Sequence, residues 1–89
     1  MGSFEIEWKR SATRELRNLA PDARRRILAA VQSLAANPRP HGSRKLVGAE
    51  NSWRVRIGDY RVVYSIFEAA LIIEIVRVGH RREVYRDLG

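Results

Sequence analysis

The sequence predicts a single α+β domain in which two helices pack as an antiparallel hairpin on a curved, mainly antiparallel sheet. Three observations lead to this class. Apolar residues alternate with period two near the N-terminus and again through most of the second half of the chain. Between these stretches, residues 11–37 carry apolar residues at helical spacing, with a proline in the middle. The 89 residues suffice for one hydrophobic core, and no linker or repeat divides them, so residues 1–89 are expected to form one domain.

The N-terminal half is expected to form a strand and then a helical hairpin. Residues 4–8 alternate with period two, as a strand does. Ser11 belongs to the residue types that cap helices, so the first helix is expected to begin there. Pro21 and Asp22 favour the start of a second helix, because proline suits the first helical position and a carboxylate is favourable near the positive end of the dipole. Asn37 and Pro38 are expected to end it. The residues expected to face the core are Phe4, Ile6, Trp8, Ala12, Leu16, Leu19, Ala23, Ile27, Ala30, Val31 and Leu34.

The C-terminal half is expected to supply the rest of the sheet. Prolines, glycines and an asparagine mark residues 38–52 as a loop region, in which Arg44–Val47 has the character of a short edge strand. A hairpin follows over residues 53–64, and its second strand is expected to continue to Phe67. After a turn near residues 68–70, residues 71–78 are largely apolar on both faces, as in a central strand. The predicted order is therefore β-α-α-β-β-β.

The segment from Trp53 to Tyr64 predicts the candidate site. A two-residue turn at Gly58-Asp59 determines which residues stand opposite each other. Three arginines then share one face, and two of their guanidinium groups are directly opposed, which is unfavourable in the absence of an anion. No acidic residue lies on this face of the two strands, so a phosphate backbone is the best candidate ligand. The predicted pairs are Ile57 with Tyr60, Arg56 with Arg61, Val55 with Val62 and Arg54 with Val63, and the apolar face consists of Trp53, Val55, Ile57, Tyr60, Val62, Tyr64 and Ile66.

The overall charge agrees with a polyanionic or acidic partner. The chain has 17 basic and 10 acidic residues, which gives a net charge of +7. Only Lys9 and Lys45 are lysines, so arginine, which binds phosphate through a planar fork, supplies the other 15 cations. A GC-rich genome would also favour arginine codons, so the positions of the arginines carry more weight than their number. The arginine face has a second interpretation, a solvated surface balanced by acids elsewhere, but its side chains are not needed for packing.

A second basic segment follows the central strand. Gly79 is expected to let the backbone turn sharply and to release residues 80–85 at the rim of the sheet. The alternative is a solvated C-terminal tail in which Tyr85 packs against the core. Arg24–Arg26, in the first turn of the second helix, are either a solvated face or a contact to RNA or an acidic partner.

Several classes of function are disfavoured by what the sequence lacks. There is no cysteine, and His41 and His80 have no metal-ligand spacing, so no disulfide, metal or cofactor is expected. His41 is expected to be a solvated loop residue. No Gly-rich phosphate loop or nucleophile triad is suggested. The longest apolar run, residues 71–78, is far shorter than the roughly 20 residues that span a bilayer, and no secretory signal is visible, so no membrane contact and a cytoplasmic location are expected. Phosphate chemistry without a metal relies on fixed cations that stabilise the charged transition state.

These residues resemble the RelE/ParE superfamily of bacterial and archaeal toxins, and within it the RelE branch. The resemblance covers nearly the whole chain. The hairpin motif WRVRIGDYRVVY (residues 53–64) is diagnostic of the superfamily, and VGHRREVY (residues 78–85) is more specific to the branch that cleaves RNA. The resemblance implies the microbial RNase-like RelE fold. It also implies a toxin of a type II toxin–antitoxin system that cuts messenger RNA in the ribosomal A site, needs no cofactor and is held inactive by an antitoxin.

The resemblance further implies roles for individual residues. Members carry two basic residues at the positions of Arg54 and Arg56, arginines at those of Arg61 and Arg81, and a tyrosine at that of Tyr85. The implied reaction is attack of the ribose 2′-oxygen on the adjacent phosphate, which leaves a 2′,3′-cyclic phosphate and a 5′-hydroxyl. Arg61 and Arg81 would stabilise the phosphorane, and Tyr85 would stack on or orient the target base. The residues expected to contact RNA are Arg54, Arg56, Lys45 and Arg82.

The general base is left open by one departure from the family. The best-known members carry lysines where this chain has Arg54 and Arg56. A lysine with a depressed pKa can act as a general base, whereas arginine stays protonated. Either His80 or Glu83 is therefore the base here, or catalysis depends on positioning by the ribosome.

Two alternatives come from other classes of function. The ParE branch shares the fold but inhibits DNA gyrase, and it generally lacks the catalytic basic set. A non-catalytic module would bind RNA with strong salt dependence and would not cut it. An exposed basic groove is also expected to bind an acidic antitoxin segment that folds on binding, either along the helical hairpin or at the sheet edge.

Overall fold

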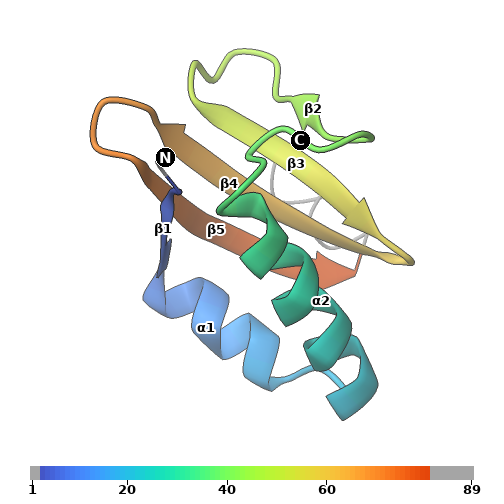
Figure 1. Ribbon diagram of the computed structural model, residues 1–89. Coiled ribbons are helices and arrows are strands. Elements are labelled where there is room, and N and C mark those ends of the chain that lie inside the picture. The colour runs from blue at the N-terminus through green and yellow to red at the C-terminus, as the bar shows by residue number, and fades with distance from the viewer. Residues whose placement is uncertain (1–2, 81–89) are drawn as a thin grey trace.

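The computed structural model describes residues 3–80 and has the α+β architecture that the sequence predicts (Figure 1). In chain order the elements are β1 (Glu5–Trp8), α1 (Arg10–Arg17), α2 (Pro21–Leu34), β2 (Arg44–Lys45), β3 (Ser52–Ile57), β4 (Tyr60–Phe67) and β5 (Ile72–His80). The strands form one mixed sheet in the order β1-β5-β4-β3-β2. β1 runs parallel to β5, and the other neighbouring strands are antiparallel, so the sheet is mainly antiparallel as expected.

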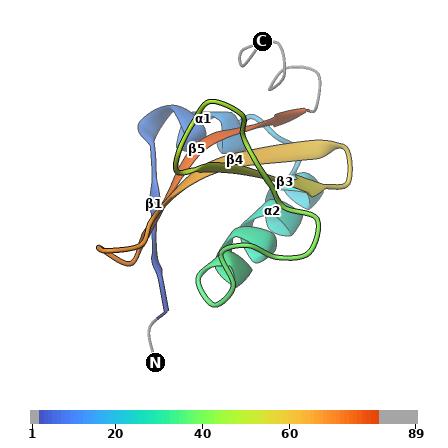
Figure 2. The ribbon, with the colours of Figure 1, turned by 90° about the horizontal axis from the view of Figure 1, so that it is seen from above.

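The hydrophobic core lies between the helices and one face of the sheet. α2 crosses the face that is turned to the viewer in Figure 1, whereas α1 lies along the β5 edge, as the view from above shows (Figure 2). Trp53, Ile57 and Tyr60 of the hairpin pack against the core with part of their surface exposed. The predicted apolar face of the hairpin is therefore confirmed, and the arginine face points away from the core. The buried core residues are Ala12, Leu16, Ile27, Val31, Leu34, Val55, Val62, Tyr64, Ile66, Ile73, Ile75 and Val78.

Helix α1 begins before the predicted cap. Its N-cap is Lys9, which makes no side-chain capping bond, and Ser11 lies inside the helix, so the expected cap at Ser11 is wrong. The backbone N–H of Lys9 donates to the Ile75 carbonyl oxygen at 3.0 Å, and the chain then leaves the sheet. The helix starts at the next residue, Arg10, after the pairing of β1 with β5 has ended at Trp8.

Helix α2 begins as predicted but ends early. Pro21 occupies its first turn, as expected from the missing N–H of proline. The helix ends at Leu34, three residues before the predicted stop at Asn37. The carbonyl oxygen of Ala35 instead accepts a hydrogen bond of 2.8 Å from the Phe4 N–H, which ties the end of the helix to the start of β1. Within residues 3–80, no helix is long and apolar enough to cross a bilayer.

The sharp turn expected at Gly79 is wrong. β5 continues through Gly79 to His80, two residues past the predicted end at Val78. Tyr60 and Arg61 of β4 pair with His80 and Gly79, so β4 offers partners along this whole stretch. A glycine permits a turn but does not impose one, and here the pairing with β4 extends the strand. One consequence is that the residue beside Arg61 on β5 has no side chain.

Glu15 takes the place of a strand partner along part of the β5 edge. β1 ends at Trp8, which stands opposite Ile75, and beyond this point α1 runs beside β5. One carboxylate oxygen of Glu15 accepts a hydrogen bond of 2.9 Å from the Val78 N–H. The other accepts from Arg77 Nε at 3.0 Å. A single side chain of α1 therefore satisfies an edge donor and fixes the helix against the sheet.

Candidate nucleic-acid interface

The hairpin has the register that its sequence predicts. Gly58 has a φ of +61°, in the left-handed region that a two-residue hairpin turn requires and that glycine adopts without strain. Ile57 pairs with Tyr60 and Arg56 pairs with Arg61 across the turn. The two opposed guanidinium groups therefore belong to one face, next to Arg54.

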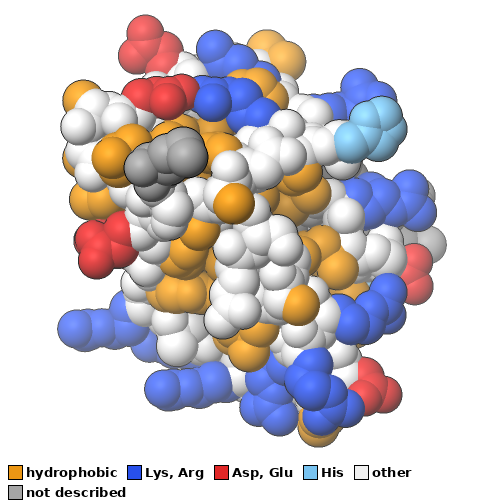
Figure 3. All heavy atoms as spheres, in the orientation of Figure 1, with side chains coloured by type: hydrophobic (Ala, Val, Ile, Leu, Met, Phe, Trp, Pro, Cys, Tyr) orange, Lys and Arg blue, Asp and Glu red, His pale blue; other side chains and the backbone are white. Residues whose placement is uncertain are grey.

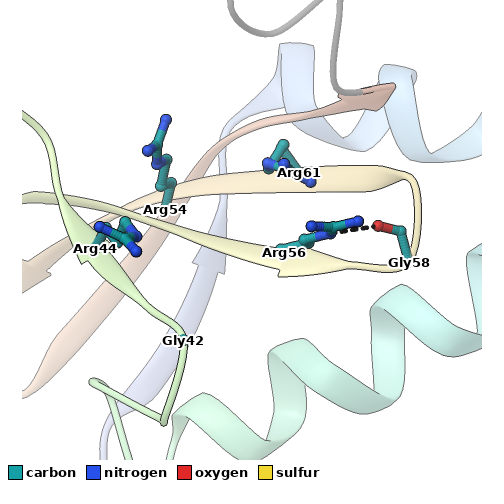
Figure 4. A pocket seen from close by; sticks show the side chains of 6 residues that line it. All are labelled: Gly42, Arg44, Arg54, Arg56, Gly58 and Arg61. Atoms are coloured by element: carbon teal, nitrogen blue, oxygen red, sulfur yellow. Dashed lines mark hydrogen bonds between the residues drawn. The ribbon is translucent and has the colours of Figure 1, made fainter.

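A pocket of about 470 Å³ lies over this face (Figure 4). Arg54 and Arg61 project from the side of β3 and β4 that faces away from α2. None of the described residues that line the pocket is acidic, so four positive charges from three adjacent strands surround one space. This arrangement is suited to an anion such as a phosphodiester, which arginine binds through paired hydrogen bonds. The lining residues are Gly42, Arg44, Arg54, Arg56, Gly58 and Arg61.

The arginines differ in their exposure to solvent. Arg61 is only 8% exposed, and its Nη1 donates a hydrogen bond of 3.3 Å to the Tyr60 carbonyl oxygen. Arg56 is exposed, and its Nε donates to the Gly58 carbonyl oxygen at 3.1 Å, which holds the side chain along the hairpin tip. Arg54 is partly buried. Water screens the charge of a buried cation less than that of an exposed one, so Arg61 acts on a bound anion most strongly for a given separation.

Arg44 completes the pocket, although the sequence assigned it no role. It lies in β2 and pairs with Arg54, which brings a fourth guanidinium to the arginine face. Sequence reasoning predicted an edge strand at this position but not the strand it would pair with. The sequence does show a basic residue, Arg44, in a predicted edge strand. Its place in the pocket follows only from the pairing of Arg44 with Arg54 of β3.

The loop before β2 is tied to the inner face of the sheet. The Tyr64 hydroxyl donates a hydrogen bond of 2.7 Å to the Pro38 carbonyl oxygen. The Arg39 guanidinium lies over the Trp53 ring, 5.2 Å from its centroid, and forms an ion pair with Glu68. Burial raises the pKa of Tyr64, against smaller lowering effects of a hydrogen bond with Ser43 and of the Arg39 charge. These contacts position the loop whose end carries Gly42 and Arg44 into the pocket.

Arg26 of α2 reaches the hairpin tip. A Cβ atom added to Gly58 would stand 2.8 Å from Arg26 Nη2, so the missing side chain of Gly58 makes room for this guanidinium. The sequence left Arg24–Arg26 undecided between a solvated face and a binding role. Arg25 forms an exposed ion pair with Asp22, which agrees with the solvated interpretation for that residue.

Other predicted site residues lie elsewhere. Lys45 is exposed on β2 and does not line the arginine pocket. His80 pairs with Tyr60, so it is on the core-facing side of the sheet at its rim, and the two rings meet edge to face with centroids 5.9 Å apart. His41 is exposed in the loop, as expected. Among residues 3–80, no three His, Cys, Asp or Glu side chains gather as a metal-binding cluster. The predicted residues Arg81, Arg82, Glu83 and Tyr85 lie outside the described residues.

Comparison with known proteins decides the family. Residues 6–85 match the family described as ParE toxin of type II toxin-antitoxin system, parDE. The chain belongs to the RelE/ParE toxin family. Among its relatives is RelE1, a candidate toxin of Methanocaldococcus jannaschii, which is 28% identical over 87 residues that cover 94% of this chain and 97% of the relative.

Solved structures of RelE proteins share the fold of this RelE/ParE toxin. RelE in the archaeal RelE–RelB complex of Pyrococcus horikoshii is 27% identical, with a TM-score of 0.79 over 89% of this chain and 96% of that chain. The toxin-antitoxin complex RelBE2 of Mycobacterium tuberculosis gives a TM-score of 0.79 at 23% identity, over 89% of this chain and 99% of that chain. The isolated E. coli RelE toxin gives a TM-score of 0.77 at 23% identity, over 97% of this chain and 94% of that chain. The family description names ParE and these relatives are RelE proteins, so the comparisons establish the superfamily and a RelE-like toxin fold.

Proposed function

We propose that this RelE/ParE toxin is a ribosome-dependent endoribonuclease that cuts messenger RNA in the ribosomal A site and thereby inhibits translation. The observation that carries the proposal is the pocket in which four guanidinium groups converge with no acidic residue among its described lining. Planar, permanently charged guanidinium donors that line one space suit a phosphodiester.

The proposed reaction transfers the phosphoryl group within the RNA. The 2′-oxygen of the ribose attacks the adjacent phosphorus, and the bond from phosphorus to the 5′-oxygen breaks. The 2′-hydroxyl loses a proton and the leaving 5′-oxygen gains one, so the products are a 2′,3′-cyclic phosphate and a 5′-hydroxyl. In this proposal Arg61 stabilises the five-coordinate phosphorane, and its being the most buried of the four cations supports that role. Arg54 and Arg56 hold the flanking backbone, and the fixed guanidinium charges take the place that a metal ion would otherwise fill.

Arg81 and Tyr85 join this site in the proposal. Gly79 stands opposite Arg61, and Arg81 follows Gly79 by two positions in the sequence. Arg81 would add a second cation to the phosphorane, Tyr85 would stack on the target base, and Arg82 and Lys45 would contact RNA farther along. The base is His80, Glu83 or a group of the ribosome. His80 is the weaker candidate of the two residues, because it lies on the opposite face from the arginines.

A cognate antitoxin is the second proposed partner. RelE proteins of P. horikoshii and M. tuberculosis are known in complexes with RelB or as RelBE2. A chain with a net charge of +7 is expected to bind an acidic antitoxin segment, which would dock along the helical hairpin or at the sheet edge. Because the proposed target is the ribosome, we expect the toxin to act in the cytoplasm.

The proposed reaction is tested by determining where the messenger is cut and which chemical groups the cut leaves at its ends. Purified toxin is added to ribosomes stalled with a defined codon in the A site, and the 5′ and 3′ ends of the cleaved messenger are mapped and analysed. The expected result is cleavage within the A-site codon that leaves a cyclic phosphate, and its loss in Arg61→Ala and in Arg81→Ala. Naked RNA of the same sequence serves as the control and should stay intact. Messenger cleavage at the wild-type level in both variants would refute the proposal.

A second candidate function is inhibition of DNA gyrase, because the matching family is described by the ParE toxin. Purified toxin would then block supercoiling of plasmid DNA by gyrase and leave the messenger uncut on ribosomes. RNA that is bound but cut under neither condition would instead favour a non-catalytic RNA-binding module.

A further inference from the structure

A second basic surface lies on α1, apart from the arginine pocket. Arg10, Arg14 and Arg17 recur at intervals of four and three residues, so they form one row along the helix, and all three are exposed. Together with Trp8 and Thr13 they line a hollow of about 630 Å³. Among residues 3–80, this hollow and the arginine pocket have no lining residue in common. Figure 3 shows Lys and Arg side chains gathered along the lower edge of the molecule, where α1 and the start of α2 lie.

Among the described residues, no acidic side chain forms an ion pair with the row. None of its three arginines forms an ion pair or a side-chain hydrogen bond with a residue in 3–80. Like charges three and four residues apart repel each other and destabilise a helix. The one acid in α1, Glu15, is turned to the β5 edge, where it binds Val78 and Arg77. The charges exposed along the row are therefore all positive, and an external anion would relieve their repulsion.

The lining of the hollow favours a nucleic-acid backbone over a protein segment. A disordered segment that folds on binding needs apolar surface to offset its loss of entropy, and Trp8 is the only large apolar residue here. RNA of a folded particle is already ordered and brings phosphates at regular spacing. From Arg10 to Arg17 the helix rises by roughly 10 Å, so the row is long enough to contact more than one phosphate of a nucleic-acid strand. Trp8 adds an aromatic surface beside the charges.

We propose that the α1 arginine row, Arg10, Arg14 and Arg17, binds the phosphate backbone of ribosomal RNA and anchors the toxin while the arginine pocket engages the messenger. The inference rests on the proposed ribosome-dependent function and adds a second contact to it. Two linked contacts raise the apparent affinity, because the second forms at a high effective concentration. The anchor makes ribosome binding steeply dependent on salt and leaves the chemistry of the pocket unchanged.

The test compares two variants that lose the same charge at different places. Arg14→Gln/Arg17→Gln disrupts the row. Arg24→Gln/Arg25→Gln on α2 is the matched control, because Arg25 is already engaged by Asp22 in an exposed ion pair. Binding of labelled toxin to purified 70S ribosomes without messenger is measured by fluorescence anisotropy at several salt concentrations. The expected result is a loss of about tenfold or more for the row variant, with a salt slope reduced by roughly one to two, and a loss below about threefold for the control.

Any other outcome refutes the proposal that the α1 arginine row binds ribosomal RNA. Equal losses in the two variants would mean a general charge effect, and an unchanged affinity of the row variant would mean that α1 does not touch RNA. Weaker binding to the antitoxin with unchanged binding to ribosomes would assign the row to a protein partner. If the wild-type toxin cleaves messenger on ribosomes and the row variant binds them equally well, only the anchor fails. If the wild-type toxin does not bind ribosomes at all, the proposed function fails with it.

Discussion

Replacement of Arg61 by glutamine is expected to reduce cleavage far more than the same change at Arg56. The two residues face each other across the hairpin, but Arg61 is 8% exposed whereas Arg56 is exposed. For a charge about 4 Å from a phosphorane oxygen, Coulomb's law gives about 4 kcal/mol at an effective dielectric constant of about 20 and about 1 kcal/mol in bulk water. Since 1.36 kcal/mol of activation free energy is a tenfold change in rate, we expect a loss of about a thousandfold for Arg61→Gln and about fivefold for Arg56→Gln.

The assay is single-turnover cleavage with toxin in excess over ribosomes that carry one defined A-site codon, so that the rate reports the chemical step. Arg61→Lys keeps the charge but not the planar fork, and its rate should lie between those of the wild type and Arg61→Gln. Thermal unfolding by circular dichroism controls for the fold, because Arg61 is buried. A native melting curve with more than a tenth of the wild-type rate for Arg61→Gln would refute the reasoning. A larger loss for Arg56→Gln than for Arg61→Gln would refute it equally.

Two further predictions concern the scaffold that positions the pocket. Glu15→Ala removes the acceptor for an N–H at the β5 edge and should lower the free energy of unfolding by about 1–3 kcal/mol, whereas Glu15→Gln keeps an acceptor and should lose less than about 1 kcal/mol. Equal losses in urea denaturation would contradict the proposed edge pairing. For Tyr64, burial raises the folded-state pKa above its ordinary value of 10.0, so the stability contributed by the neutral phenol is complete below pH 10 and is lost as the pH rises through the folded-state pKa. Tyr64→Phe should cost about 1 kcal/mol at neutral pH, through loss of the hydrogen bond to the loop, and this deficit should shrink above about pH 10. A deficit that stays constant up to about pH 11 would show that the ionisation of Tyr64 is not linked to folding.

Anchoring of the loop before β2 shows how residues outside the pocket contribute to it. Arg39 and Pro38 are held by Trp53, Glu68 and Tyr64, all of which belong to the sheet or to the turn after β4. The pocket therefore has one wall formed by the paired strands β3 and β4 and another wall whose position depends on these few loop contacts.

Local sequence alone predicted the hairpin and its arginine face. A two-residue turn sets the register of the strands that it joins, and period two then assigns every side chain to a face. The opposition of Arg56 and Arg61 follows from these two rules without reference to the rest of the chain. The start of α2 at Pro21 was predicted for a similar local reason, because proline fixes its own φ and lacks an N–H.

Tertiary structure decided what local rules leave open. Arg44 joins the pocket only because β2 pairs with β3 in one register, and His80 faces away from the arginines only because β5 extends through Gly79 beside β4. Glu15 meets Val78 across 63 positions of sequence, a contact that no spacing rule anticipates. Turns and periodicity act over a few residues, so the sequence determined the faces of each element. Which element lies beside which depends on burying the apolar faces together and on pairing the free strand edges, and this balance belongs to the folded chain as a whole.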